Sequence, residues 1–175
     1  WQAQQKCPEL VTASAHYDRY IRFSKLCRKI YADYTDNIEP FGLDEAWLDV
    51  TGSKKLFGNG VEIAKKISNR IKNELDITVS IGVSYNKIFA KIGSDYKKPD
   101  AITYISKDNY KKIVWELPCE DLLYVGKATK AKLNKLGIFT IGQIANCPIN
   151  ILRSNLGKWG EILHTFANGN DKSTV

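Results

Sequence analysis

The sequence predicts an α+β protein in which a sheet with packed helices is followed by a small all-helical region. Between residues 14 and 106, segments with the period of an amphipathic helix alternate with short β-branched runs. After about residue 107 the strand signals end, and short helical segments follow between glycines and prolines. The 175 residues are enough to bury a core of this kind. We therefore expect helices packed on one face of a sheet, with a boundary near residues 106–112.

The first predicted helix covers residues 14–34, and Ser14 is its candidate N-cap. Its apolar stripe, with spacings of mostly three and four residues, consists of Tyr20, Phe23, Leu26, Cys27, Ile30 and Tyr34. Such a stripe is typical of a helix that lays one face on a sheet.

Residues 38–52 have an extended pattern with a break at Pro40 and Gly42. From Trp47 to Thr51, polar and apolar side chains alternate with the period of a strand. This stretch is therefore expected to enter the sheet.

Two further helices alternate with two further strands. Residues 58–76 form a predicted helix whose apolar positions repeat every four residues, at Ile63, Ile67, Ile71 and Leu75. The β-branched run 77–85 predicts a strand, residues 86–98 a helix that ends before Pro99, and residues 101–106 a short strand.

The charge balance leaves two interpretations open. The chain carries 26 Lys and Arg against 19 Asp and Glu, a net charge of +7. This surplus suits a nucleic acid or another polyanion, but it also suits a lysine-rich surface that keeps a protein in solution. His16 and His164 are isolated, and no C-x-x-C pair occurs among the four cysteines. Reduced structural thiols are therefore expected rather than a zinc site.

Hydropathy and the first residues bear on where the protein works. The longest apolar stretches are far shorter than the roughly 20 residues that span a bilayer. No charged start followed by an apolar secretory core is present, so we expect a cytoplasmic protein. The sequence begins with Trp1 and contains no Met, so we expect a piece of a longer protein.

Two adjacent carboxylates, Asp44 and Glu45, interrupt the apolar run PFGLDEAWLDVTGS at residues 40–53. Adjacent side chains of a strand point to opposite faces, so one carboxylate could be solvated while the other caps a turn. An apolar strand is nevertheless a costly place for a carboxylate that is neither paired nor bound to metal. Clustered oxygen ligands suit Mg²⁺, which bridges to substrate phosphates. Both interpretations remain open from these residues alone.

Three motifs in a fixed order resemble one family. The run IEPFGLDEAWLDVTGS at 38–53 resembles the central palm motif of Y-family translesion DNA polymerases, especially the bacterial DNA polymerase IV type. Residues 79–102, VSIGVSYNKIFAKIGSDYKKPDAI, resemble that family's strand, helix and Lys-Pro motif. Residues 117–145 and 156–171 are similar to its thumb. The resemblance covers nearly the whole chain.

The resemblance implies roles for the acidic residues of the palm motif. Asp44 would be the aspartate shared by two catalytic Mg²⁺ ions, and Glu45 would bind the ion that activates the primer 3′-hydroxyl. Asp49 lies in the same motif and is expected to be a structural acid at the strand edge. Gly42 stands where the family usually has serine, which leaves both ligands in place.

The second motif carries the lysines expected to meet the nucleotide. By resemblance, Lys98 would grip the triphosphate of the incoming dNTP, with its backbone restricted by Pro99. Lys91 would lie near the site. The alternative is an ordinary solvated basic face. Ala101 replaces a glycine that is common after the lysine-proline turn.

The third motif resembles a helix-hairpin-helix between Leu122 and Ile138. Its inward candidates are Leu122, Val125, Ala128, Ala131, Leu133 and Leu136. Such hairpins offer backbone N–H groups to nucleic-acid phosphates without reading base sequence. The DNA-binding residues expected are Gly126, Lys127, Thr129 and Lys130, with no acid among the lysines that follow. Tyr124 stands where many such hairpins carry glycine, and a plain helical hairpin remains the alternative.

These motifs predict three parts: residues 1–16 as the tail of a fingers domain, 17–108 as the palm, and 109–175 as the thumb. The implied function is a template-directed, low-fidelity translesion DNA polymerase that adds dNTPs to a primer 3′-OH by two-metal phosphoryl transfer. Its cofactor would be two Mg²⁺ ions. Its partners would be primer-template DNA, dNTP and, through regions outside this chain, a sliding clamp; a monomer without a membrane partner is expected.

The resemblance also implies parts that this sequence does not hold. The family takes a further metal-binding aspartate from an N-terminal segment, and a little finger domain follows its thumb. We therefore expect this piece to be inactive alone and the intact protein to polymerise. The alternative is a non-catalytic DNA-binding relative that acts as an accessory repair protein. A nucleotide cyclase on a related palm is disfavoured because it leaves the thumb unexplained.

Overall fold

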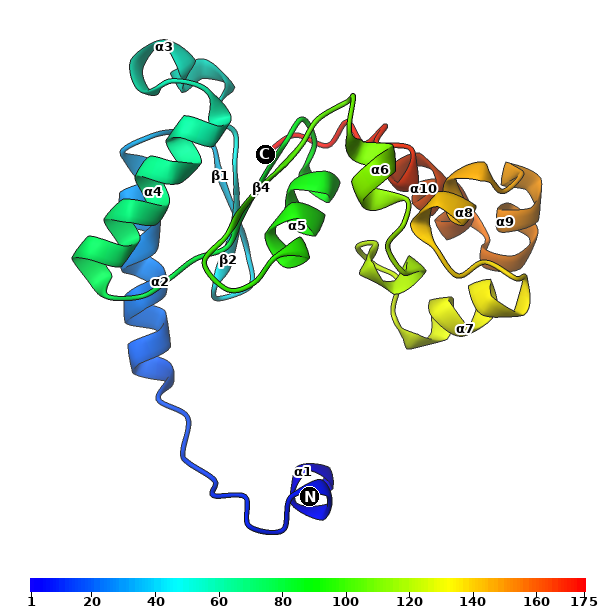
Figure 1. Ribbon diagram of the computed structural model, residues 1–175, viewed down its shortest axis with the longest axis horizontal. Helices are drawn as coiled ribbons and strands as arrows, with labels where there is room; N and C mark the ends of the chain where they lie inside the picture. The colour runs from blue at the N-terminus through cyan, green and yellow to red at the C-terminus, as the bar shows by residue number, and fades with distance from the viewer.

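A computed structural model describes all 175 residues, Trp1–Val175 (Figure 1). A region of strands and long helices is followed by a cluster of short helices, as the sequence predicts. In chain order the elements are α1 (Gln2–Lys6), α2 (Tyr17–Ala32), β1 (Ile38–Phe41), β2 (Glu45–Leu48), η1 (Thr51–Ser53), α3 (Lys54–Phe57), α4 (Gly60–Leu75), β3 (Ile81–Ser84), α5 (Lys87–Tyr96), β4 (Ile102–Ile105), α6 (Tyr110–Val114), η2 (Cys119–Asp121), α7 (Lys127–Lys135), α8 (Ile141–Asn146), α9 (Ile149–Leu156) and α10 (Lys158–Ala167).

The strands form two pairs. β1 and β2 form an antiparallel hairpin in which Phe41 pairs with Glu45 and Ile38 with Leu48. β3 and β4 run parallel, with α5 as the connection between them. A parallel pair needs such a crossover, and a helix usually supplies it.

Helices cover both faces of the β3–β4 pair, so the expectation of helices on one face is wrong. Neighbouring strand residues point to opposite faces. A Cβ atom on Gly82 would overlap the backbone oxygen of Ala90 in α5, whereas the next residue, Val83, lies 3.0 Å from the Cβ position of Gly60 in α4. Figure 1 shows α2 and α4 on one side of the strands and α5 on the other.

The outer core lies between α2 and α4. It consists of Ile30, Tyr34, Ile63, Ile67 and Ile71, with Leu48 and Ile81 packed against it. The predicted four-residue repeat of α4 is therefore confirmed, and each fully buried isoleucine contributes about 2 kcal/mol of transfer free energy. The Asn59 side chain accepts hydrogen bonds from the Val61 and Glu62 N–H groups, and Glu62 bonds back, which fixes the start of α4.

The observed helix α2, Tyr17–Ala32, is shorter than the helix predicted for residues 14–34. α2 begins after His16 without a side-chain cap, so Ser14 is not its N-cap. Only the C-terminal end of the predicted stripe is buried, because Tyr20 is 48% exposed and Phe23 36% exposed. The segment before α2 extends away from the rest of the chain (Figure 1).

Two details of the extended stretch also differ from expectation. Pro40 does not interrupt a strand but lies within β1, opposite Ala46. The strand predicted for Trp47 to Thr51 ends at Leu48, because a 3₁₀ turn begins at Thr51.

The second core crosses the expected boundary at 106–112. Phe89 and Ile92 of α5 and Ile105 of β4 belong to one buried cluster with Val114, Leu133 and other residues of the short helices. The chain's last residues also return to α5, because Asn86 Nδ2 donates to the Gly169 oxygen and Lys87 Nζ to that of Thr174. The two regions are therefore packed together, and the domain boundaries stay a prediction.

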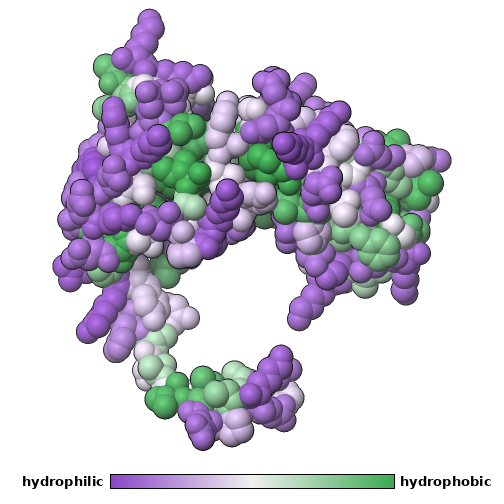
Figure 2. Space-filling model, viewed as in Figure 1, coloured by the Kyte–Doolittle hydropathy of each residue, from purple (hydrophilic) through white to green (hydrophobic).

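The surface is mostly hydrophilic over the strand region, with hydrophobic residues exposed on the N-terminal segment (Figure 2). None of the helices is both long enough and apolar enough to cross a membrane.

Candidate active site and nucleic-acid interface

The carboxylate pair lies at the tip of the β1–β2 hairpin. Asp44 is the last residue of the turn and is exposed, and Glu45 is the first residue of β2 and half-buried. The sequence suggested that the pair interrupts an apolar strand. In the structure the pair instead lies where the turn ends and β2 begins. Gly42 adopts a φ of 77° in this turn, a conformation that glycine reaches without steric cost.

One face of the hairpin is directed toward α5. Glu39 pairs with Trp47 and Phe41 with Glu45, so these four side chains share a face. The Trp47 ring lies 4.7 Å from that of Phe41, and its indole N–H donates to the Lys87 oxygen over 3.0 Å. The hairpin and α5 are thereby held in a fixed relation.

Lys87 strengthens this contact but is not free for a ligand. Its ammonium lies 2.6 Å from Glu39 Oε2 and 4.6 Å from the centre of the Trp47 ring. Only 13% of its side chain is exposed. Lys87 and Glu39 were not predicted as a pair, because nothing in the sequence indicates the register between a hairpin and a later helix.

Lys91, one turn further along α5, contacts the predicted site directly. Its Nζ lies 2.9 Å from Glu45 Oε1 and 2.6 Å from Asp95 Oδ2. Burial lowers the pKa of Lys91, but the hydrogen bonds that its ammonium donates to Asp95 and Glu45 outweigh burial and leave this pKa above its ordinary value. Lys91 is therefore a protonated cation beside the candidate metal ligand.

Lys98 lies just beyond the end of α5, with 55% of its side chain exposed. Its Nζ lies 2.7 Å from Asp95 Oδ1. Burial raises the pKa of Asp95, but hydrogen bonds from Lys91 and Lys98 outweigh this and leave its pKa below the ordinary value. Asp95 was not predicted as a site residue, although its spacing of four from Lys91 and three from Lys98 was available in the sequence.

Asp49 is a structural acid. Its Oδ1 accepts a hydrogen bond of 2.9 Å from the Thr51 N–H at the start of η1. The side-chain and backbone hydrogen bonds of Thr51 lower the pKa of Asp49. The carboxylate thus caps a turn and does not join the pair at the hairpin tip.

The hairpin tip supplies part of a ligand set that suits a divalent cation. No group of three or more His, Cys, Asp or Glu residues is placed to hold a metal ion. Asp44 and Glu45 offer hard carboxylate oxygens, and no ion pair engages Glu45 Oε2. Mg²⁺ is commonly held by one or two carboxylates together with water and substrate phosphates, which matches this donor set.

The predicted helix-hairpin-helix has only one full α-helix between Leu122 and Ile138. The 3₁₀ turn η2 stands in place of a first helix, and α7 begins at Lys127 after the N-cap Gly126. Leu122, Val125 and Leu133 are buried and Leu136 packs against the same core. Ala128 and Ala131 are exposed, so two of the inward candidates are wrong.

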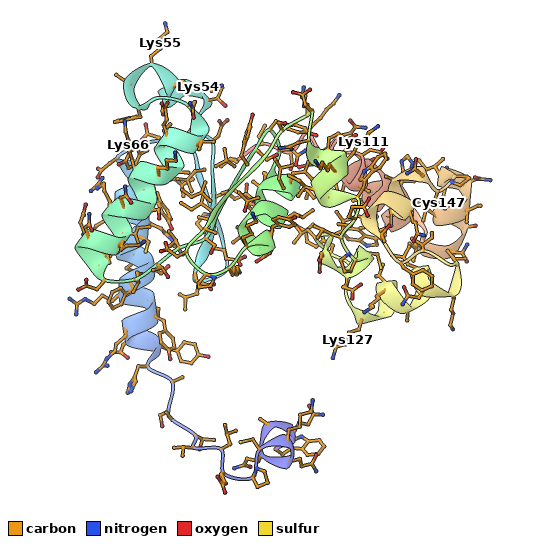
Figure 3. The ribbon with its side chains drawn as sticks, in the orientation of Figure 1. Lys54, Lys55, Lys66, Lys111, Lys127 and Cys147 are labelled. Atoms are coloured by element: carbon orange, nitrogen blue, oxygen red, sulfur yellow. The ribbon has the colours of Figure 1, made fainter.

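The turn before α7 adopts the backbone conformation of a glycine-containing hairpin, although Tyr124 stands where many such hairpins carry glycine. Tyr124 adopts a φ of 71°, the left-handed conformation that glycine would take there, and its side chain is exposed. The first N–H groups of α7, from Lys127 to Thr129, precede the helix's hydrogen-bonded turns and lack intrahelical partners. Figure 3 shows Lys127 pointing away from the helices into solvent.

Lys130 differs from Lys127 because it has an acidic partner. Its ammonium forms an ion pair with Glu120, which raises the pKa of Lys130 and lowers that of Glu120. No acid lies among the lysines of this stretch in the sequence, so the partner of Lys130 comes from outside it. Glu120 precedes Lys130 by ten residues, so helical spacing could not reveal the pair.

A cavity of about 620 Å³ lies between α5 and the loop that precedes α7. Its walls include Lys91 and Asp95 of α5 and the loop from Asp121 to Gly126. Carboxylates of both regions face this space, because Asp95, Glu120 and Asp121 line it. Burial, Glu120 and Asp95 raise the pKa of Asp121. The structure therefore brings the predicted nucleotide-binding helix and the predicted DNA-binding loop to a common opening.

The sequence and the fold match known proteins across nearly the whole chain. Residues 1–95 match the model of the impB/mucB/samB family, and residues 120–171 match the model of the DNA polymerase-iota thumb domain. DNA polymerase IV of Acetivibrio thermocellus is 57% identical over all 175 residues of this chain, which correspond to 44% of that protein. The chain thus spans less than half the length of this relative.

Solved structures give the same result. The crystal structure of DinB from Sulfolobus solfataricus has a TM-score of 0.87 and 31% identity, over 99% of this chain and 52% of that one. An insertion ternary complex of Dbh DNA polymerase has a TM-score of 0.86 and 30% identity, over 99% of this chain and 51% of that one. The mixed α/β fold predicted from the sequence is thereby confirmed. The chain belongs to the impB/mucB/samB family, the Y-family DNA polymerases.

Proposed function

We propose that the intact protein is a template-directed DNA polymerase of the low-fidelity translesion class. The observation that carries this proposal is the Asp44–Glu45 pair at a hairpin tip, where Glu45 forms an ion pair with Lys91 of α5, the helix that ends just before Lys98. The pair lies in a chain whose full length matches a DNA polymerase IV. The reaction would join a primer 3′-hydroxyl to the α-phosphate of a dNTP.

The residues present would share the work of one phosphoryl transfer. Asp44 and Glu45 would hold two Mg²⁺ ions together with the nucleotide's phosphates. When bound, these ions would supply a more acidic 3′-hydroxyl and neutralise the charge that develops on the reacting phosphate. Lys98 is exposed at the helix end and would turn from Asp95 to the triphosphate, a more highly charged partner.

Primer-template DNA would lie on the helical region beside the cavity. The unpaired amides at the start of α7, with Gly126, Lys127 and Thr129, would bind backbone phosphates. Lys130 would contribute less, because its charge is already engaged by Glu120. Such contacts hold DNA of any sequence, as a polymerase requires.

We further propose that these 175 residues do not polymerise alone. The hairpin tip supplies two carboxylates, and the chain corresponds to 44% of a DNA polymerase IV. A sliding clamp contacted through other regions, a monomeric state and a cytoplasmic location are part of the same proposal.

Primer extension with Mg²⁺ tests the proposal. The intact protein should extend a primer on a template, and Asp44→Asn should abolish extension without changing DNA affinity by more than a few-fold. Asp108→Asn is the matched control. Asp108 follows β4 in the sequence, whereas the hairpin precedes it, and its carboxylate is exposed and forms no ion pair. Equal extension by both variants would show that Asp44 is not a catalytic ligand, and no extension by the intact protein would favour a non-catalytic DNA-binding relative.

A further inference from the structure

A chain of ion pairs connects the candidate metal ligand with the candidate triphosphate lysine. Lys91 Nζ bridges Glu45 Oε1 at 2.9 Å and Asp95 Oδ2 at 2.6 Å. The other oxygen of Asp95 lies 2.7 Å from Lys98 Nζ. The four side chains alternate in sign, and their formal charges cancel.

We propose that Asp95 is a positioning residue that couples Lys98 to Glu45. When Lys98 leaves Asp95 for a triphosphate, Asp95 draws Lys91 toward itself, and Glu45 is released to bind a divalent cation. This inference rests on the proposed roles of Lys98 and Glu45, but it assigns a function to Asp95 that the metal and nucleotide sites do not require.

The two lysines of this ion-pair chain differ in exposure in the way that the coupling requires. The side chain of Lys91 is only 18% exposed, so its ammonium depends on Glu45 and Asp95 for compensation of its charge. The side chain of Lys98 is 55% exposed, so water can replace Asp95 as its partner at little cost. Lys98 can therefore leave the chain of ion pairs more easily than Lys91 can.

Competition for Lys91 transmits the change. While Lys98 is bound, Asp95 shares its charge between two lysines, and Lys91 is correspondingly available to Glu45. Once Lys98 has left, Lys91 is the only ammonium on Asp95, and its attraction to Glu45 weakens. Because coupling between two binding events is reciprocal, a cation on Glu45 would equally favour the release of Lys98 toward a triphosphate.

A double-mutant cycle on Mn²⁺ binding tests the coupling without nucleotide and without turnover. Free Mn²⁺ is counted by electron paramagnetic resonance in the intact protein. Lys98→Met imitates the departure of Lys98 and should tighten Mn²⁺ binding about two- to fivefold, the range of one partly exposed ion pair. In an Asp95→Asn background the same substitution should have a much smaller effect, because the intermediate partner is gone.

Lys97→Met is the matched control for charge acting through space. Lys97 is the neighbour of Lys98 and has no acidic partner, so its loss removes the same charge and leaves Asp95 engaged. The coupling predicts that Lys98→Met tightens Mn²⁺ binding more than Lys97→Met does in the wild-type background. In the Asp95→Asn background the two substitutions should change the Mn²⁺ affinity equally. Equal effects of Lys98→Met in both backgrounds would overturn the coupling.

Two further variants separate this inference from the proposed function. Lys91→Met should tighten Mn²⁺ binding and make it insensitive to Asp95→Asn, because Lys91 carries the coupling. Glu45→Gln should weaken Mn²⁺ binding in every background. If Glu45→Gln has no effect, the metal role of Glu45 fails and the coupling fails with it. If Glu45→Gln weakens binding but the cycle is additive, only the coupling fails.

Discussion

At the scale of the residue, Lys98 differs from the lysines within α5 because its partner is a single exposed carboxylate and its side chain is mostly in solvent. Lys98→Ala in the intact protein should raise the KM for dNTP about tenfold with a smaller change in kcat, since it removes a contact to the bound nucleotide. Steady-state single-nucleotide incorporation measures both constants. A lower kcat at unchanged KM would contradict a triphosphate role, and Lys97→Ala is the control.

The depressed pKa of Asp95 leads to a prediction about acid stability. Burial raises this pKa, but Lys91 and Lys98 outweigh burial and hold it below the ordinary value of 3.8. Such a carboxylate stabilises the fold above its unfolded-state pKa, and the stabilisation is lost as pH falls through the folded-state pKa. Urea unfolding between about pH 5 and pH 2 should therefore show a shallower loss of stability for Asp95→Asn than for the wild type. Parallel curves would mean that the ion pairs contribute nothing to stability.

The two lysines at the start of α7 should contribute unequally to DNA binding. Lys127 has no ion pair, whereas Lys130 is engaged by Glu120. Lys127→Ala should weaken binding to DNA of any sequence and reduce the salt slope by about one, and Lys130→Ala should do less. Fluorescence anisotropy at several salt concentrations gives both slopes. A larger effect at Lys130 would show that DNA displaces Glu120.

At the scale of the element, Gly82 determines how closely α5 packs on β3. A Cβ at this position would overlap the backbone of Ala90 and Ser94, which cannot move without shifting the helix. Gly82→Ala should therefore lower the free energy of unfolding by about 3 kcal/mol, the upper part of the range for overpacking. Gly52→Ala is the control, because no atom lies within 4 Å of its Cβ position. Chemical denaturation compares the two variants.

Residue patterns within a short stretch of sequence predicted the helices and helix ends that depend only on neighbouring residues. The Ile63, Ile67 and Ile71 repeat predicted α4, and the Lys-Pro step predicted the end of α5 before Pro99. The break predicted at Gly42 lies in the hairpin turn, but the pairing of Phe41 with Glu45 across that turn was not predicted, because the turn and both strands lie within one short apolar run. Likewise the stripe of α2 predicted burial at Tyr20, which the fold leaves exposed. What covers a helix face depends on tertiary contacts that spacing does not encode.

For the candidate site, too, the sequence predicted residues within contiguous motifs but not the contacts between elements. Asp44, Glu45 and Lys98 were identified by resemblance, since their motifs are contiguous in the sequence. The ion pairs of Lys91 with Glu45 and of Lys130 with Glu120 join different elements. They depend on the register of α5 against the hairpin and of α7 against η2, which only the packed structure determines.

At the scale of the whole molecule, one buried core joins the strand region to the short helices. Phe89 and Ile105 share it with Leu133 and Ile144, and all four side chains are fully buried. We therefore expect the two regions to unfold together. Native-state hydrogen exchange should give α5 and α8 the same free energy of opening. A markedly lower value for α8 would mean that the helical region opens independently.

Glu45 is proposed to bind a catalytic cation in a DNA polymerase. Single-turnover incorporation of one dNTP by the intact protein, with Glu45→Gln compared with the exposed Glu116→Gln, tests it most directly. Loss of a metal ligand should remove several kcal/mol of transition-state stabilisation, about a hundredfold or more in rate, while the Kd for DNA changes only a few-fold. A Glu45→Gln rate within threefold of the Glu116→Gln rate would contradict a metal-binding role of Glu45.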